Sequence, residues 1–220
     1  KKRVLSIIVV HVFGNLVNLN REFVKFCNSR NIKIIEDAAE SLGSKYLNSK
    51  KQPSTVGDIG CLSFNGNKIL TSGGGGMLVF KKKAHYNYGQ YLSNQSKNDS
   101  INFIHNEVGY NFRLSNLHAA IGNAQLKYFK KILQKKRSIH NFYSNKIDRM
   151  KGIKILKEKK YCKSNYWLNV IEINKNYFKI NKDKLIKKFL QNKIEVRSLW
   201  YPNHLQKHLK KFQKYKIKNA

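Results

Sequence analysis

An aspartate and a lysine stand where a folded chain would leave them accessible for chemistry. Asp37 follows a short β-branched segment, and Lys68 lies shortly before a run of four glycines. A carboxylate at a strand end can hold a proton on a ring nitrogen, and a lysine beside a flexible turn can form a Schiff base. These are the two groups that pyridoxal 5'-phosphate (PLP) chemistry requires, and Ser63 is a candidate ligand for the cofactor phosphate.

Each of these residues also has a purely structural interpretation. An aspartate after a strand often caps a helix, a lysine near glycines is usually a solvated surface residue, and a serine can belong to a turn. The glycine run at 73–76 could connect two strands, and it lacks the Lys-Ser/Thr ending of a Walker loop. The combination, in this order and at this spacing, favours PLP chemistry.

The first part of the chain has the pattern of a strand, a helix and a second strand. Residues 5–10 are continuously apolar, residues 20–30 have apolar side chains at helical spacing, and residues 32–35 form another β-branched run. Such a βαβ unit implies a right-handed crossover and a parallel sheet, whose carboxyl edge lines a ligand crevice. The acidic segment 36–40 occupies that edge.

The rest of the chain predicts an α/β fold in two parts. Residues 1–139 are expected to belong to a large PLP-binding domain with a mainly parallel sheet, and residues 140–220 to a smaller C-terminal α/β domain. The predicted strands are 61–64, 77–80, 167–173 and 194–199, and the predicted helices are 113–136 and 181–192.

The net charge of +32 has to be weighed against the enzyme interpretation. Residues 81–220 carry 33 Lys and Arg against 7 Asp and Glu, which could bind nucleic acid through counterion release. However, 37 of the 44 cations are lysines scattered through helix-like stretches. Surfaces that bind nucleic-acid phosphates rely more on arginine and on clustered aromatic side chains. Drift in the base composition of the gene therefore explains the excess of lysine better than selection for a nucleic-acid interface does.

The cysteines and the hydropathy pattern exclude other classes. Cys27, Cys61 and Cys162 are far apart and in no metal-ligand spacing, so neither a disulfide framework nor a metal site is expected. No stretch approaches the ~18 apolar residues of a membrane span. We therefore expect a cytoplasmic protein that binds neither nucleic acid nor membrane.

Eight segments, in colinear order over nearly the whole chain, resemble the DegT/DnrJ/EryC1/StrS family of sugar aminotransferases. They are VHVFG at 10–14, EDAAESLG at 36–43, GDIGCLSF at 57–64, NK at 67–68, GGGGM at 73–77, HNEVGYNFRLS at 105–115, AAIG at 119–122 and EVRSLWYPNH at 195–204. The resemblance implies the fold type I of PLP-dependent aminotransferases.

The resemblance assigns roles to five residues around the cofactor. Lys68 matches the Schiff-base lysine, and Asp37 matches the partner of the pyridinium nitrogen. Ser63 matches the phosphate-binding serine, and Ala39 would pack against one face of the ring. Glu40 falls where the family places a polar side chain, often glutamine, near the phenolic oxygen.

Four residues further along the chain match family positions that do not belong to these five cofactor-binding positions. Asn111 resembles a residue that reaches the cofactor phosphate of a neighbouring subunit, which implies a homodimer, and Arg113 is a further candidate for that role. Arg197 and His204 lie in a segment expected near the sugar nucleotide.

The resemblance also implies a reaction. Relatives that dehydrate sugars carry histidine at the position of Lys68, so the lysine indicates transamination. The amino donor would be L-glutamate and the acceptor a nucleotide-linked 4-keto-6-deoxy sugar. Segment 65–68 and the glycine run most resemble enzymes that make 4-amino-4,6-dideoxy sugars for surface polysaccharides, including those of the legionaminic acid and perosamine routes.

Members of this family extend beyond both ends of the chain. We therefore expect a partial large domain and an incomplete small domain, with an exposed sheet edge where further strands would pair. Two alternatives remain open at this point: an inactive fragment or relative that retains the fold and the dimer interface, and a basic nucleic-acid-binding protein.

Overall fold

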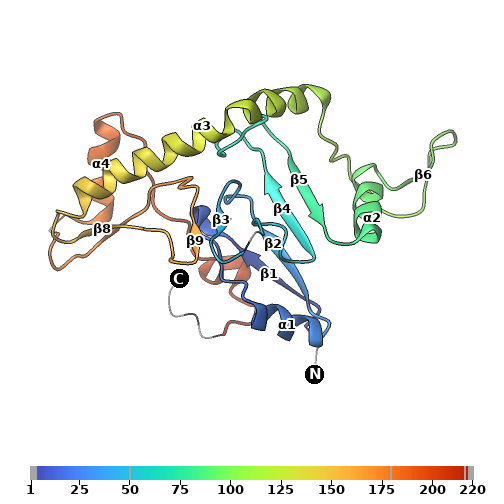
Figure 1. Ribbon diagram of the computed structural model, residues 1–220, viewed down its shortest axis with the longest axis horizontal. Helices are drawn as coiled ribbons and strands as arrows, with labels where there is room; N and C mark the ends of the chain where they lie inside the picture. Colours follow the sequence, from blue (N-terminus) through green and yellow to red (C-terminus); the bar gives the residue numbers. More distant parts are fainter. Residues whose placement is uncertain (1–3, 50, 179, 216, 218–220) are drawn as a thin grey trace. The chain divides into compact units, whose positions relative to one another are not determined.

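The chain divides into two compact units (Figure 1). The computed structural model describes residues 4–49, 51–178, 180–215 and 217. The first unit comprises residues 1–149 and 155–171, and the second comprises 150–154 and 172–220. The domain boundary predicted at 139/140 falls inside a long helix, α3, and stays a prediction for the whole protein.

A four-stranded sheet forms the centre of the first unit. Its strands are β1 (Ser6–Val10), β2 (Lys33–Asp37), β4 (Ile59–Ser63) and β5 (Gly76–Phe80), in the order β1-β2-β4-β5. The pairs β1/β2 and β2/β4 are parallel, and β5 runs antiparallel to β4. The mainly parallel sheet predicted from the sequence is therefore confirmed.

Helix α1 (Arg21–Ser29) connects β1 to β2 and confirms the predicted βαβ unit. The helix begins where it does because the side chain of Asn20 accepts a hydrogen bond from the backbone N–H of Phe23, which satisfies one of the free donors of the first turn. Cys27 of this helix packs with Val9 and Ile34 in a buried hydrophobic cluster. Hydrophobic burial therefore fixes which face of the sheet α1 covers.

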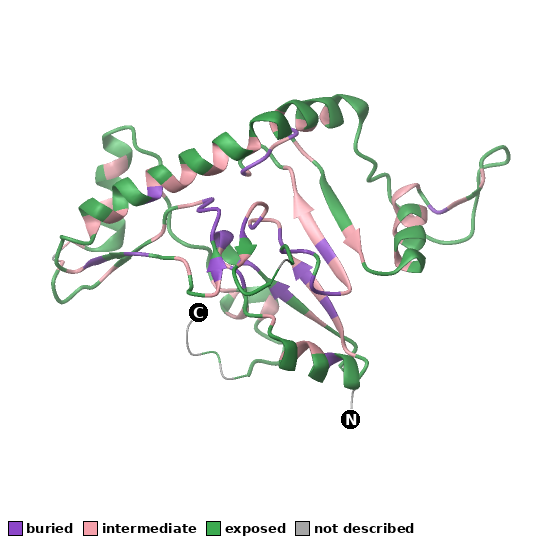
Figure 2. Ribbon diagram, viewed as in Figure 1, coloured by how far each residue is buried: buried purple, intermediate pink, exposed green. Residues whose placement is uncertain are grey.

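A second hydrophobic cluster lies between the loops that follow the strands and helix α3 (Asn116–Ile147). Phe13, Ile69 and Trp167 are buried there, and Phe129 and Leu133 of α3 pack against them. The first half of α3 contributes little to this core and is mostly exposed (Figure 2). Among the described residues, no helix combines the length and apolar character that a bilayer crossing would need.

Shorter elements complete the first unit. They are the 3-10 turn η1 (Val12–Gly14), β3 (Lys45–Tyr46), α2 (Lys83–Ser93), β6 (Lys97–Asp99), β7 (Ile104–His105) and β9 (Cys162–Lys163). β3 pairs with β9, and β6 pairs with β7, both antiparallel. No helix was predicted at α2. None of its residues is buried, so the apolar stripe that signals a helix is weak there.

In the second unit, helix α4 (Lys182–Gln191) confirms the predicted helix and is capped by Asn181, which accepts from the backbone N–H of Lys184. The 3-10 turns η2 (Asn203–Leu205) and η3 (Lys207–Leu209) follow it. Strands β8 (Ile153–Ile155) and β10 (Ile171–Ile173) form a two-stranded sheet.

One strand prediction is wrong, and a second is confirmed only at its end. Residues 194–199 form no strand, because the backbone N–H of Ile194 bonds back to the carbonyl of Phe189 at the end of α4. The predicted strand 167–173 is reduced to β10, since Tyr166 has a left-handed backbone (φ 49°) and Trp167 turns into the core. At 194–199 the apolar run follows the end of a helix, and at 167 it enters the core. An apolar run forms a strand only where another strand is available to pair with it.

Candidate active site

The carboxyl end of β2 carries two acids whose side chains lie on opposite faces of the sheet. Successive residues of a strand alternate between faces, so Glu36 and Asp37 diverge although they are neighbours. Asp37 is paired in register with Cys61 of the parallel strand β4, and Ser63 lies two residues further along β4. Asp37, Cys61 and Ser63 therefore share one face.

Asp37 is held at the strand end by backbone contacts on both sides. One carboxylate oxygen accepts a hydrogen bond from the backbone N–H of Ala39 at 3.1 Å, and the carbonyl of Asp37 accepts from His11 N at 3.0 Å. Burial, followed by the charge of Asp37, raises the pKa of the Cys61 thiol. Asp37 thus presents its carboxyl group, fixed in position, on the face that it shares with Ser63.

The loop after β4 carries Lys68. Ser63 Oγ accepts from the backbone N–H of Asn65 at 3.4 Å, which leaves its O–H hydrogen available to a ligand oxygen. Lys68 N donates to the carbonyl of Asn65 at 3.0 Å, closing a turn. The turn is anchored to the glycine run, because Phe64 N donates to the carbonyl of Gly75, where φ is 80°. A residue with a side chain would be strained at that angle.

One small pocket brings together four of the predicted site residues. Ala39 and Glu40 line it from the segment after β2, and Ser63 and Lys68 line it from β4 and the loop that follows. The other lining residues are Leu42, Ile69, Leu70, Asn165 and Trp167. Side chains that are separate in sequence therefore meet at the carboxyl edge of the parallel strands, as the βαβ pattern predicts.

Glu40 fixes one wall of this pocket. Its carboxylate accepts a hydrogen bond from the backbone N–H of Phe13 at 2.8 Å, and its backbone carbonyl accepts from the amide of Asn165 at 2.9 Å. Phe13 itself has a left-handed backbone (φ 57°). The site thus depends on a segment near residue 13 and on another near residue 165.

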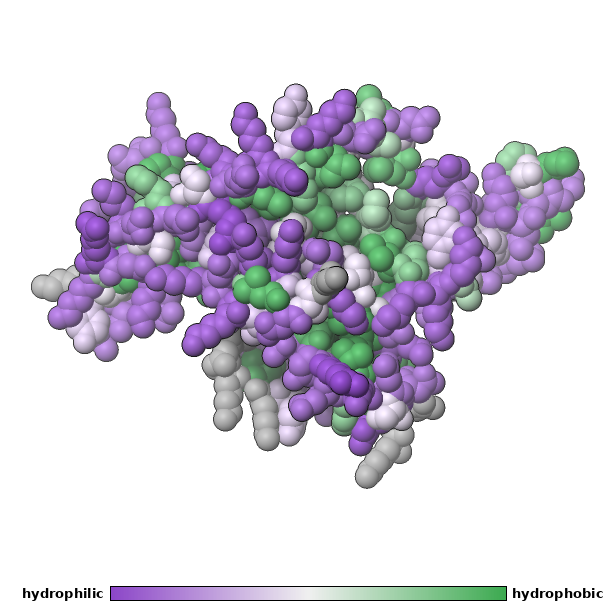
Figure 3. All heavy atoms as spheres, viewed as in Figure 1, coloured by the Kyte–Doolittle hydropathy of each residue, from purple (hydrophilic) through white to green (hydrophobic). Residues whose placement is uncertain are grey.

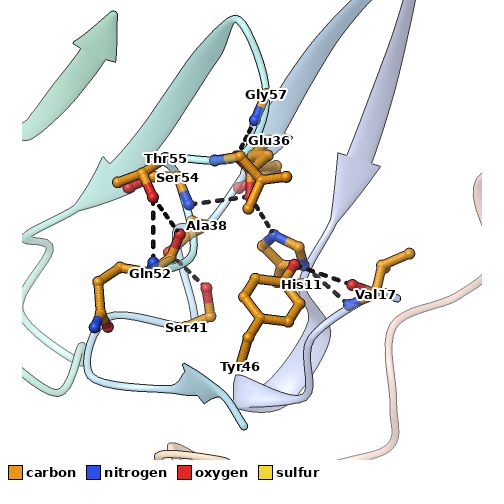
Figure 4. A network of polar contacts seen from close by, with 12 residues as sticks. His11, Val17, Glu36, Ala38, Ser41, Tyr46, Gln52, Ser54, Thr55 and Gly57 are labelled. Carbon is orange, nitrogen blue, oxygen red and sulfur yellow. Dashed lines mark hydrogen bonds and ion pairs between the residues drawn. The ribbon is translucent and has the colours of Figure 1, made fainter. Parts of the chain in front are cut away.

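Glu36 points the other way, into a closed network (Figure 4). Its carboxylate is fully buried and accepts from His11 Nε2 at 3.0 Å and from the backbone N–H groups of Ser54, Val56 and Gly57 at 2.6–3.1 Å. Since His11 Nδ1 accepts from Val17 N, the ring donates to Glu36 through Nε2.

The hydrogen bonds decide the ionisation of Glu36. Burial by itself raises the pKa of this carboxyl, but the hydrogen bonds from His11 and from the N–H groups of Gly57 and Val56 outweigh it and hold the pKa below its ordinary range. Burial and the charge of Glu36 raise the pKa of Tyr46, whose ring lies edge-on to His11. Glu36 is therefore a structural anion that fastens loop 54–57 and the segment after β1 to β2.

Asp37 does not itself line the pocket, and four further candidate residues lie away from it. Asn111 is exposed and bridges to Asn94, and Arg113 lines a different groove of about 900 Å³ beside β5 and α2. Figure 3 shows hydrophobic surface gathered beneath the first half of α3 and over β4 and β5. Arg197 is exposed and His204 is half-buried, and both belong to the second unit. Their assigned roles stay predictions.

Sequence reasoning missed Trp167 and Asn165, which line the same pocket as Lys68. Both are buried, Trp167 with 3% and Asn165 with 1% of its surface exposed. The available signal was compositional, because Trp167 is one of two tryptophans in the chain and lies in a segment rich in lysine. Position in the sequence gave no hint of proximity, since Trp167 contacts Asn67 across a separation of 100 residues.

Comparison with known proteins supports this assignment of the fold. EpsN of Bacillus subtilis is 35% identical over 201 residues, covering 91% of this chain and 50% of EpsN. The GDP-perosamine synthase of Escherichia coli O157:H7 is 33% identical over 213 residues, covering 96% of this chain and 56% of that protein. The chain thus spans about half the length of these curated relatives.

Solved structures share the fold. The aminotransferase TlmJ from Streptoalloteichus hindustanus superposes with a TM-score of 0.83 at 21% sequence identity, over 93% of this chain and 54% of TlmJ. The profile of one protein family matches residues 1–220, which is the full chain. The chain therefore belongs to the DegT/DnrJ/EryC1/StrS aminotransferase family.

Proposed function

We propose that the protein containing this chain is a PLP-dependent aminotransferase that acts on a nucleotide-linked 4-keto-6-deoxy sugar. L-glutamate is the proposed amino donor, and the amino sugar formed would serve surface polysaccharide synthesis. The protein would act as a cytoplasmic homodimer. The observation that carries this proposal is the pocket in which Lys68, Ser63 and Glu40 meet, next to the strand end that presents Asp37.

The functional groups around the pocket fit the cofactor on which the family's aminotransferases depend. A primary amine, a hydroxyl and a carboxylate are provided by Lys68, Ser63 and Asp37 on neighbouring strand ends. Ala39, which has a small side chain, lies on the pocket wall. When bound, PLP supplies an electron-withdrawing ring that lets a proton leave and return at the carbon next to the transferred nitrogen.

The chain's own residues divide the remaining work. Asp37 would pair its carboxyl group with the ring nitrogen and keep that nitrogen protonated. The Lys68 amine would hold the cofactor and, once released, carry a proton to and from the reacting carbon. Ser63 would donate its hydroxyl to a phosphate oxygen. Glu40 would set the position of the wall near the phenolic oxygen, because Phe13 N already holds one of its carboxylate oxygens.

The names of several relatives support the class of substrate. One is the UDP-4-amino-4,6-dideoxy-N-acetyl-beta-L-altrosamine transaminase of Campylobacter jejuni, which is 29% identical over 206 residues. Asn111 and Arg113 are proposed to reach the cofactor phosphate of the second subunit, and Arg197 and His204 to contact the sugar nucleotide.

The test combines PLP, glutamate and the Lys68→Ala variant of the full-length protein. We expect an absorbance band near ~420 nm on addition of PLP, loss of that band with L-glutamate, and its return when a UDP- or GDP-linked 4-keto-6-deoxy sugar follows. Borohydride reduction should fix the cofactor to the peptide that contains Lys68. Lys68→Ala should lose the band and at least about 10³-fold in kcat.

The control variant is Lys83→Ala, which removes an exposed lysine of α2 and should leave the band and kcat unchanged. A folded protein that forms no band would contradict the proposal and would indicate an inactive relative. A band that survives Lys68→Ala would reject the assignment of Lys68.

A further inference from the structure

Trp167 is placed to interact with Lys68 in two ways. The indole Nε1–H donates to the carbonyl of Asn67, the residue before Lys68, at 2.7 Å. The Nζ atom of Lys68 lies 4.1 Å from the centroid of the same ring. One side chain therefore holds both the backbone that carries the lysine and the amine at its end.

The ring itself is rigidly held. Trp167 packs with Phe13 and Ile69 in a buried cluster, and its backbone N–H donates to the side-chain oxygen of Asn165 at 2.8 Å. The amide of Asn165 in turn donates to the carbonyls of Glu40 and Leu42, both at 2.9 Å. Trp167 is thereby tied to the segment that follows Asp37, so Lys68 is positioned relative to the other side of the pocket.

Burial makes this contact stronger than a surface pair. A cation over an aromatic face gains more when the ring is desolvated, and only 3% of the surface of Trp167 is exposed. Lys83 over Tyr86 offers a comparison within the chain: the distance of 4.2 Å is similar, but 40% of Tyr86 is exposed. The two pairs have similar distances, but the buried ring of Trp167 is expected to bind its lysine more strongly than the exposed ring of Tyr86 does.

We propose that Trp167 is a positioning residue for Lys68. Its indole face binds the Lys68 ammonium whenever the lysine is not covalently attached to the cofactor, and its N–H holds the loop at Asn67. This proposal rests on the proposed function of Lys68. A lysine side chain is flexible because it has four rotatable bonds. A fixed binding site therefore keeps the freed amine close to the carbon that must receive its proton.

The direct test measures the reactivity of Lys68 in the cofactor-free, full-length protein. An amine-acylating reagent is added, and the acylation rate of each lysine is followed by peptide mass spectrometry. Trp167→Leu removes the aromatic face, and we expect Lys68 to react about 5- to 30-fold faster. Trp167→Phe keeps the face and loses the N–H, so the rate should stay within about threefold of the unmodified protein.

Lys83 and Tyr86 provide the matched control. Tyr86→Leu should change the acylation of Lys83 by less than about threefold and should leave Lys68 unaffected, because the ring is exposed. Neither Trp167 variant should change the rate at Lys83. An equal Lys68 rate in Trp167→Leu and in the unmodified protein, with both folded by circular dichroism, would overturn the proposal.

A second measurement covers the case in which Trp167→Leu does not fold. Lys68→Met removes the ammonium and keeps Trp167, so the indole fluorescence of the cofactor-free protein should differ from that of the unmodified protein, whereas Lys83→Met should leave it unchanged. Identical emission in Lys68→Met would also overturn the proposal.

The kinetic readout separates positioning from binding. In the loaded enzyme, Trp167→Leu should lower kcat by about 2- to 30-fold with little change in the KM for glutamate, and Trp167→Phe should restore most of the loss. If Lys68→Ala still binds PLP covalently, the proposed role of Lys68 fails, and this inference fails with it. If Lys68→Ala behaves as proposed and Trp167→Leu matches the unmodified protein in reactivity and kcat, this inference alone fails.

Discussion

The two faces of the central sheet place neighbouring acids in opposite situations. On the face covered by α1, Glu36 lies with Val9 and Ile34, fully buried, and its carboxylate accepts four hydrogen bonds from the protein. On the other face, Asp37 shares its side with Val10, which is 45% exposed. The strand is the same, and only the side on which each side chain lies differs.

This difference separates a structural acid from a chemical one. A buried carboxylate with a full set of internal donors has no capacity left for a ligand, and it stabilises the fold only while those donors stay in place. Asp37 faces the side that also carries Ser63, where an incoming group can still bind. Burial and hydrogen-bond supply therefore identify which of two adjacent acids can do chemistry.

The strongest way to break the comparison is to exchange one acid at a time. Glu36→Gln should lower the free energy of unfolding by about 2–4 kcal/mol, because an uncharged amide would face four donors. Asp37→Asn should change it by less than about 1 kcal/mol but should abolish glutamate-dependent bleaching of the PLP band. Urea denaturation of both variants measures the stabilities, and similar losses would contradict the assignment.

Acid provides a second test of the covered face. The pKa of Glu36 is lowered on folding, so its contribution to stability is present above the unfolded value of ~4.3 and is lost as pH falls through the folded value. The stability difference between the unmodified protein and Glu36→Gln should therefore be constant near neutral pH and shrink below about pH 4.3. A difference that grows on acidification would show that the carboxylate is not stabilised by folding.

The smallest expected effect sharpens the comparison on the open face. Ser63→Ala should weaken PLP binding roughly tenfold, the equivalent of one hydrogen bond to a charged phosphate, and leave the urea midpoint unchanged. Ser29→Ala, in an exposed position of α1, should change neither quantity. Equal PLP affinity of Ser63→Ala and the unmodified protein, measured by titration of the absorbance band, would remove Ser63 from the phosphate site.

Local patterns were sufficient wherever a short segment determines its own structure. The β-branched runs gave β1 and β2, the apolar spacing gave α1 and α4, and the order of motifs placed Lys68 and Ser63 at one crevice. They were insufficient at residues 194–199, where the apolar run ends a helix, and at Trp167, where it enters a core.

Strand propensity, helix periodicity and motif order are local properties, and they were enough to assign the fold family and the groups available for chemistry. Packing of the folded unit, by contrast, buries Glu36 against His11, leaves Asp37 on the open face and places Trp167 under the amine of Lys68. Side-chain direction at a strand end follows from pairing register, and a contact across 100 residues follows from packing of the whole unit. Neither is encoded in the residues that surround each position.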